Sequence, residues 1–137
     1  MENTGYLIMN SSKHLTYDLN SELRKQDLTA PQWAVLQQIN RYQQERPTTA
    51  KQLVTLLDMD KPTLSVILKR LEQKNFIIKK RSSHDSRSYE LFLTDSGKQT
   101  YLSGEKISEH VLEKFIAPLS MEEKRQLNEL LQKLNGV

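Results

Sequence analysis

Apolar residues recur every three or four positions along most of the chain, the spacing of amphipathic helices. The first such stripe contains Ile8, Leu15, Leu19 and Leu23 and predicts a helix over residues 6–25. Steps of seven and four residues return to the same side of a helix, so this segment presents one continuous apolar face. Such a face needs another element to cover it.

Start signals divide the rest of the chain into separate helices. A serine or threonine followed three residues later by glutamine or glutamate is a capping box, which satisfies free amide groups at a helix N-terminus. An aspartate or threonine can also cap a helix without that partner. The signals are Thr29 with Gln32, Thr49 with Gln52, Ser120 with Glu123, and Asp60 and Thr94 without a box. They predict helices over residues 30–44, 50–57, 61–74, 95–116 and 121–134.

The periodicity changes after residue 75. The segments FIIKKR and YELFL are rich in branched and aromatic residues, and the second alternates in the two-residue rhythm of a strand. The polar residues 82–88 lie between them and favour a turn. We therefore expect a β-hairpin whose tip carries His84, Asp85 and Arg87.

The order of these elements predicts a winged helix-turn-helix, a fold that is mainly α with a small β-wing. Two helices joined by a short turn at Asp58 and Met59 stand directly before the hairpin. In this arrangement the second helix enters the major groove of DNA and the wing reaches the neighbouring minor groove. We expect an N-terminal dimerisation helix (1–28), a winged helix-turn-helix region (29–94) and C-terminal dimerisation helices (95–137), forming one intertwined domain.

The distribution of charge supports a DNA-facing surface. The chain has 137 residues, enough for one domain with a hydrophobic core, and a formal net charge of only +3. Between Lys61 and Arg87, however, the chain has eight basic and two acidic residues. The net charge of this segment is therefore +6, and that of the rest of the chain is −3. A charge run alone is usually a solvated face. Beside a predicted winged helix, the same run suits the neutralisation of DNA phosphates.

Composition also disfavours several classes of function. Without cysteine the chain has no disulfide, no thiolate zinc site and no thiol redox switch. No apolar run reaches the roughly 18 residues of a membrane span, and the N-terminal segment lacks the layout of a secretion signal, so we expect a cytoplasmic protein without membrane partners. A Gly-rich phosphate loop and an H-E-x-x-H motif are also absent, and the three histidines fall in separate elements. We expect no enzyme activity and no cofactor.

The residues predicted to contact DNA lie on the helix at 61–74 and on the hairpin. Small or hydrogen-bonding groups near the start of that helix suit base edges, whereas the later cations suit phosphates. Hydroxyls are also frequent at helix starts for purely structural reasons. The predicted DNA-binding residues are Lys61, Pro62, Thr63, Ser65, Val66, Lys69, Arg70, Lys79, Lys80, Arg81, Ser83, His84, Asp85 and Arg87.

Three segments resemble the MarR family of transcription regulators. They are LTAPQWAVLQQI (28–39), TAKQLVTLLDMDKPTLSVILKRLEQKNFI (49–77) and DSRSYELFLTDSG (85–97). The last is the most specific, because it is similar to the family's D-x-R wing followed by L-T-x-x-G. The resemblance implies an obligate homodimer with interdigitated terminal helices, and repression or activation of nearby genes that a small molecule often releases.

Two positions depart from the family pattern. Family wings often carry an arginine where this chain has Ser86, so affinity would depend more on Lys79, Lys80 and Arg81. The glycine usual after the recognition helix is Asn75 here, which tolerates the same left-handed backbone at little cost.

The terminal helices favour a dimer on physical grounds as well. Their apolar residues are too many for the small winged unit to cover. A two-fold pairing would bury them and set the two recognition helices about 34 Å apart, one turn of DNA, which implies a palindromic operator. The alternative is a monomer with a helical cap. We expect a homodimeric regulator, and more specifically a repressor.

Other interpretations stay open at this stage. A winged fold can act as a protein-interaction module that does not read DNA, although lysine is depleted from protein interfaces. A small-molecule effector has candidates in His14, Tyr17 and Trp33, of which Trp33 also fits the core. A metal site would require Glu109, His110 and His14 to converge, and histidines on helix faces are more often structural, so we expect no metal.

Overall fold

The computed structural model describes residues 2–43, 46–82 and 87–137. In these residues it contains six helices and one three-stranded antiparallel sheet, which confirms the predicted mainly α fold with a small β-wing. The elements are α1 (Thr4–Arg24), α2 (Ala30–Tyr42), β1 (Thr48–Thr49), α3 (Ala50–Leu56), α4 (Lys61–Gln73), β2 (Ile77–Arg81), β3 (Tyr89–Leu93), α5 (Asp95–Ile116) and α6 (Met121–Leu134). We call β2 and β3 the wing.

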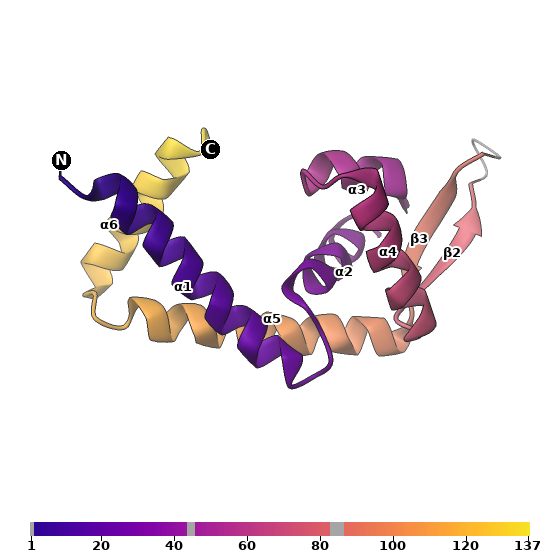
Figure 1. Cartoon of the computed structure of the whole chain (residues 1–137), viewed down its shortest axis with the longest axis horizontal. Coiled ribbons are helices and arrows are strands. Elements are labelled where there is room, and N and C mark those ends of the chain that lie inside the picture. Colours follow the sequence, from indigo (N-terminus) through magenta and orange to yellow (C-terminus); the bar gives the residue numbers. More distant parts are fainter. Residues whose placement is uncertain (1, 44–45, 83–86) are drawn as a thin grey trace.

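The long helix α5 connects the two ends of the molecule (Figure 1). Helix α1 crosses α5, and α6 stands at the end where both chain termini lie. At the opposite end, α3, α4 and the wing are grouped around α2. The helix predicted to read DNA, α4, therefore lies at the end opposite α6, and α5 spans the distance between them.

The predicted capping residues begin the helices as expected. Thr29 Oγ1 accepts a hydrogen bond from the amide of Gln32 at 3.2 Å, and Gln32 Oε1 accepts one from the amide of Thr29 at 3.3 Å. The same reciprocal box starts α3 and α6, whereas Asp60 and Thr94 cap α4 and α5 with a single side-chain bond. Each cap satisfies amide groups that have no partner inside the helix. Local sequence therefore determines where these helices begin.

The core lies within the winged unit and reaches α1 and α5. Side chains from α1 to β3 form one cluster in which several are fully buried: Leu23, Leu28, Val35, Leu36, Ile39, Leu53, Leu64, Leu71 and Ile77. Burial of each such side chain contributes about 1.5–3 kcal/mol. This cluster fixes α4 and the wing on a rigid base.

The sheet contains a short strand that the sequence did not predict. Strand β1 pairs with β3 through Thr48 opposite Leu91, so that β3 is the central strand. On the other side of β3, β2 pairs in register from Ile77 opposite Leu93 to Arg81 opposite Tyr89. Pairing on both sides holds the base of the wing against α3 and α4.

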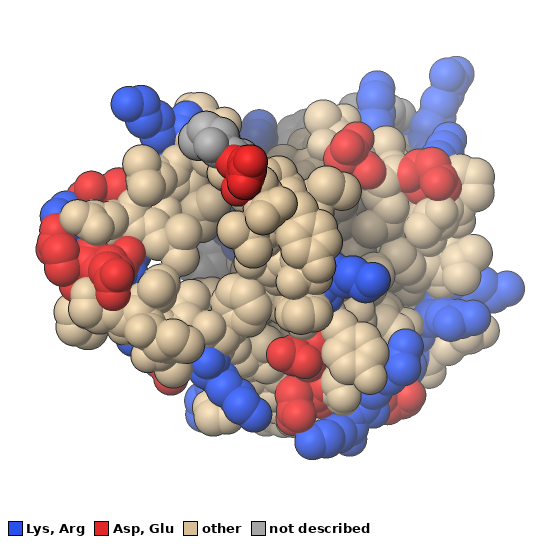
Figure 2. Space-filling view, turned by 60° about the vertical axis from the view of Figure 1, so that its left-hand side comes forward, with Lys and Arg blue, Asp and Glu red and all other residues tan. Residues whose placement is uncertain are grey.

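The terminal helices keep apolar side chains exposed. No residue of α6 is buried, and α1 buries only Leu23. The exposed side chains include Tyr6, Leu7, Ile8, Met9, Met121, Leu130, Leu131 and Leu134. Figure 2 brings this end forward and shows a broad area with few Lys, Arg, Asp or Glu, which gather mostly at its edges. Within the described ranges, none of the helices combines the length and the apolarity needed to cross a membrane.

Candidate DNA-binding surface

The turn between α3 and α4 orients α4 relative to the core. Asp58 takes a left-handed backbone with φ of 48°, and Asp60 then caps α4 by accepting a hydrogen bond from the amide of Thr63 at 2.7 Å. The hydrogen bonds from Thr63 lower the pKa of the Asp60 carboxyl below its ordinary value. A carboxylate at this position also suits the positive end of the helix dipole. The start of α4 is therefore well defined.

Helix α4 has one buried and one exposed face. Leu64, Ile67 and Leu71 point into the core. The predicted DNA-binding residues of this helix are all exposed: Lys61, Pro62, Thr63, Ser65, Val66, Lys69 and Arg70. After Lys61, neutral side chains occupy the first turns of this face and the cations Lys69 and Arg70 follow them.

The cations of the wing divide between its two faces. Lys79 and Arg81 lie over the ring of Tyr89, with Nζ and Cζ at 5.2 and 5.9 Å from the ring centroid. Lys80 instead lies over Phe92, with its Nζ at 5.3 Å from that centroid. Successive residues of a strand point to opposite faces, which explains the division. Lys80 is therefore on the other side of the hairpin from its two neighbours.

A groove of about 880 Å³ separates α3 and α4 from the wing. Its floor is apolar and includes Leu64, Leu68 and Leu91. Its edges carry five cations from α3, α4 and the wing, namely Lys51, Lys61, Lys69, Lys79 and Arg87. The structure thus brings four of the predicted cations, Lys61, Lys69, Lys79 and Arg87, to one groove.

Glu72 is an acidic member of this surface. Its Oε1 lies 3.5 Å from Nζ of Lys79, with both side chains partly exposed. Such a partly exposed pair contributes little to stability, because water screens it. Glu72 therefore offsets part of the charge of Lys79 at the base of the groove.

Two cations at the C-terminal end of α4 lie away from the groove. Arg70 lines a small depression of about 220 Å³ beside the α1–α2 turn, together with Lys74. Lys74 bonds to Asp27 and Gln32 and is directed away from the groove. Lys51, in contrast, lines the groove although it is not among the predicted DNA-binding residues. It lies in α3, which precedes the basic segment between Lys61 and Arg87.

Several predicted residues fall between β2 and β3 in the sequence. Ser83, His84 and Asp85 lie outside the described residues, as does the family-variable position Ser86. Arg87, the first described residue after this segment, is exposed and lines the groove.

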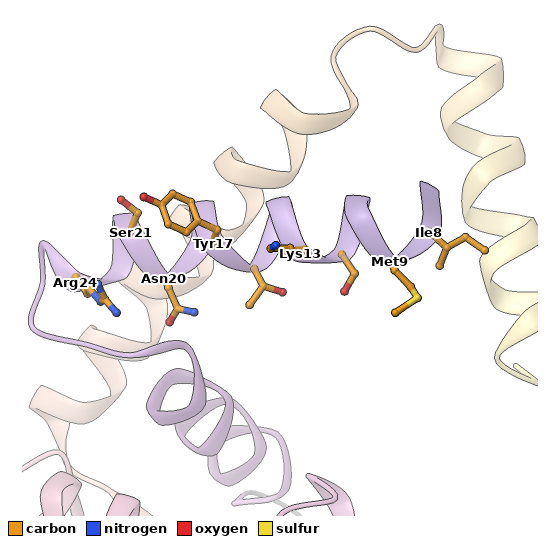
Figure 3. Close-up of a pocket in the computed structure, with 9 residues that line it drawn as sticks. Ile8, Met9, Lys13, Tyr17, Asn20, Ser21 and Arg24 are labelled. Carbon is orange, nitrogen blue, oxygen red and sulfur yellow. The ribbon is translucent and has the colours of Figure 1, made fainter. Parts of the chain in front are cut away.

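The three effector candidates are not brought together. Tyr17 lines a hollow of about 700 Å³ along α1, and Figure 3 shows it projecting from the same side of the helix as Ser21. His14 is exposed on α1 and does not line this hollow. Trp33 is buried in the core and stacks on Tyr101 with ring centroids 6.4 Å apart. Only Tyr17 of the three is positioned at an open hollow.

The histidines on α1 and α5 do not form part of a metal-binding cluster. His14 and His110 are both exposed. Across the described part of the chain, no group of three His, Asp or Glu side chains is placed to hold a metal ion.

Comparison with known proteins gives a family and related regulators. A family profile described as MarR family matches residues 26–88. The HTH-type transcriptional regulator MgrA of Staphylococcus aureus is 35% identical over 118 residues, covering 86% of this chain and 77% of that protein. The HTH-type transcriptional regulator SarZ of Staphylococcus epidermidis is 31% identical over 127 residues, covering 93% and 82%.

Solved structures share the whole fold. Wild-type MarR from E. coli in its apo form superposes with a TM-score of 0.86 at 24% identity, over 98% of this chain and 97% of that chain. A complex of S. aureus MepR with DNA gives a TM-score of 0.84 at 26% identity, over 97% and 96%. A mutant MarR from E. coli complexed with operator DNA gives a TM-score of 0.83 at 25% identity, over 97% of this chain and 94% of that chain. The likeness therefore extends over the terminal helices as well as the winged unit.

Proposed function

Because this chain belongs to the MarR family of transcription regulators, we propose that it represses genes beside a palindromic operator, which it binds as a homodimer. It is a DNA-binding regulator and not an enzyme, as its relatives are transcription regulators. The observation that carries the proposal is the groove edged by Lys51, Lys61, Lys69, Lys79 and Arg87.

In the proposed complex, α4 enters the major groove of DNA. Thr63 and Ser65 then lie where hydroxyls reach base edges, and Lys69 lies where a cation meets the phosphate backbone. The wing approaches the adjacent minor groove, with Lys79 and Arg87 on the side that faces α4. Base contacts supply the choice of sequence, and phosphate contacts supply most of the affinity.

Dimerisation is proposed to occur through α1, α5 and α6. The exposed apolar residues at the end formed by α1 and α6 support it, since a contiguous apolar surface of this kind usually marks an interface. A symmetric pair presents two α4 helices to successive turns of the duplex. Sedimentation or light scattering should therefore give twice the chain mass of 16.0 kDa.

A small-molecule effector is proposed to bind the hollow along α1. Apart from Ile8 and Met9, which belong to the proposed dimer interface, its lining combines Tyr17 with the cations Lys13 and Arg24, a mixture that suits a small amphipathic anion. Benzoate is a simple probe of this class. It should weaken the DNA complex of the wild-type protein and leave that of Tyr17→Ala unchanged; equal responses of the two proteins would contradict this site.

The DNA-binding proposal is tested by titrating the purified protein against a library of genomic duplex fragments at several salt concentrations. We expect selective binding that falls steeply with salt, and its loss in Lys69→Ala and Arg87→Ala. Lys106→Ala is the matched control, because it removes the same charge from an exposed position on α5. Absent binding, or binding insensitive to salt, would favour a protein-interaction module instead.

A further inference from the structure

The C-terminal end of α4 is bonded to the turn between α1 and α2. Lys74, the residue directly after α4, donates from Nζ to the backbone oxygen of Asp27 at 2.5 Å and to Oε1 of Gln32 at 3.2 Å. The Asp27 carboxylate lies 3.6 Å from the same ammonium. One side chain thus contacts three acceptors at the junction of α1 and α2.

Two of the three acceptors of Lys74 are fixed by their own surroundings, whereas the Asp27 carboxylate is 92% exposed. Gln32 is only 3% exposed, and its Oε1 also accepts from the amide of Thr29 in the capping box of α2. Asp27 holds a left-handed backbone with φ of 56°. Hydrogen bonds from a charged donor are stronger than those between neutral groups. Lys74 is therefore held in a defined position.

The same end of α4 is bonded to α5 on its other side. Thr94 caps α5, and its Oγ1 donates a hydrogen bond to the backbone oxygen of Asn75 at 2.6 Å. Its amide donates a second hydrogen bond to the backbone oxygen of Phe76 at 3.1 Å. At Gly97 a Cβ atom would lie 1.9 Å from the backbone oxygen of Phe76, so only glycine permits this approach. The residues from Lys74 to Phe76 are thus held between the α1–α2 junction and α5.

Helices α1 and α5 lead from this junction to the opposite end of the molecule, where α6 stands (Figure 1). We propose that Lys74 is a positioning residue for DNA recognition, which sets the angle of α4 against the dimerisation helices and so the spacing of the two α4 helices. It acts through Asp27 and Gln32 and does not contact DNA. The inference rests on the proposed homodimeric DNA binding.

The first test needs no DNA. Since the chain has no cysteine, Ser65→Cys places a single spin label on the exposed face of α4 in each protomer. Pulsed dipolar spectroscopy should give a narrow distance distribution, which broadens in Lys74→Met and is restored in Lys74→Arg. Lys25→Met is the matched control, because it removes an exposed pair with Glu22 close to the same junction.

The spin-label measurement can overturn the inference in two ways. An unchanged distribution in Lys74→Met means that the bonds do not position α4. Absence of a dipolar signal in the protein that keeps Lys74 means that there is no pair of α4 helices to be spaced. Circular dichroism of each variant verifies that α-helix content is retained.

The second test uses operators whose half-sites are moved apart by one base pair at a time. The wild-type protein should bind one spacing best. Lys74→Met should lose about tenfold in affinity for that spacing, the equivalent of one charge-assisted hydrogen bond, and much of its preference among spacings. Its salt dependence should stay that of the wild type. If Lys74→Met instead lost the same affinity on every spacing, and the dependence of log affinity on log salt fell by about one, Lys74 would be a phosphate contact. That result would overturn the inference.

The failures of the two proposals are distinguishable. If the wild-type protein binds no duplex, the proposed function fails, while the spin labels still report whether Lys74 orders α4. If the wild-type protein binds and Lys74→Met behaves identically on every spacing, the function stands and the role of Lys74 is refuted.

Discussion

The indole nitrogen of Trp33 donates a hydrogen bond to the backbone oxygen of Tyr101, 3.3 Å away. This bond joins α2 to α5, and the two rings lie almost parallel, with an angle of 12° between their planes. Gly104 makes the approach possible, because a Cβ atom there would lie 2.3 Å from Cδ1 of Trp33. The winged unit is therefore packed directly on the long helix that leads to the other end of the molecule.

Gly104→Ala should lower the free energy of unfolding by about 1–3 kcal/mol, as an added methyl group overpacks the contact with Trp33. Gly5→Ala is the control, because a Cβ atom added there would have no neighbour within 4 Å and alanine favours the helix. Urea unfolding of both variants measures the difference. Equal stabilities would show that Trp33 moves aside without cost.

The two threonines of β1 should respond in opposite directions to valine. Thr48 is buried, and its Oγ1 has no hydrogen-bond partner among the described residues, so Thr48→Val should be neutral or should raise stability by up to about 1–3 kcal/mol. Thr49 caps α3, so Thr49→Val should cost about 0.5–2 kcal/mol. Thermal unfolding of the pair checks the signs, and a loss in both would refute the assignment for Thr48.

Much of the fold follows from local signals in the sequence. The boxes at Thr29 and Thr49 and the caps at Asp60 and Thr94 act within a few residues of themselves, so spacing alone predicts them. Strand β1 gives no such signal. Its two residues have no periodicity, and they form a strand only because they meet β3, which is distant in the sequence.

The candidate site was predictable in composition but not in arrangement. The outward position of Lys69 and Arg70 follows from the helical stripe of α4. The separation of Lys80 from Lys79 follows from the alternation of a strand, whereas the direction of Lys74 depends on Asp27, which is 47 residues away in the chain. Long-range contacts of this kind leave no trace in charge spacing.

Acid should weaken the start of α4. The hydrogen bonds from Thr63 hold the folded-state pKa of Asp60 below its ordinary value of 3.8. The resulting stability is therefore present above that value and is lost as pH falls through the lower folded-state pKa. In Asp60→Asn, the free energy of unfolding measured with urea should depend less on pH in this range. Some pH dependence should remain, because the pKa values of Glu123 in its capping box and of Glu122 beside Arg125 are also lowered. An unchanged slope would contradict the role of Asp60.

The two faces of the wing should differ in DNA binding. Lys79→Ala should weaken binding to all duplexes and lower the salt slope by up to about one, because Lys79 lines the groove. Lys80→Ala removes the same charge from the opposite face of the hairpin and should change affinity and slope less. Fluorescence anisotropy at several salt concentrations compares them. Equal effects would mean that the surface extends around the wing.

Charge on α6 should dissociate the dimer. Leu130 and Leu131 are 59% and 45% exposed in the single chain, so replacing both with glutamate places charges inside the proposed interface. Light scattering should then give the chain mass of 16.0 kDa. Val66→Glu, at an apolar position on α4 that is 54% exposed, is the control and should stay dimeric. A dimer that tolerates both glutamates would place the interface elsewhere.

The most direct measurement is selection of duplexes from a random pool with the purified wild-type protein, followed by sequencing. The account predicts an inverted repeat whose half-site centres lie about one turn of DNA, or roughly 34 Å, apart, since two α4 helices related by a two-fold axis read equivalent bases. Enrichment of a single unpaired half-site, or of no sequence above the starting pool, would contradict it.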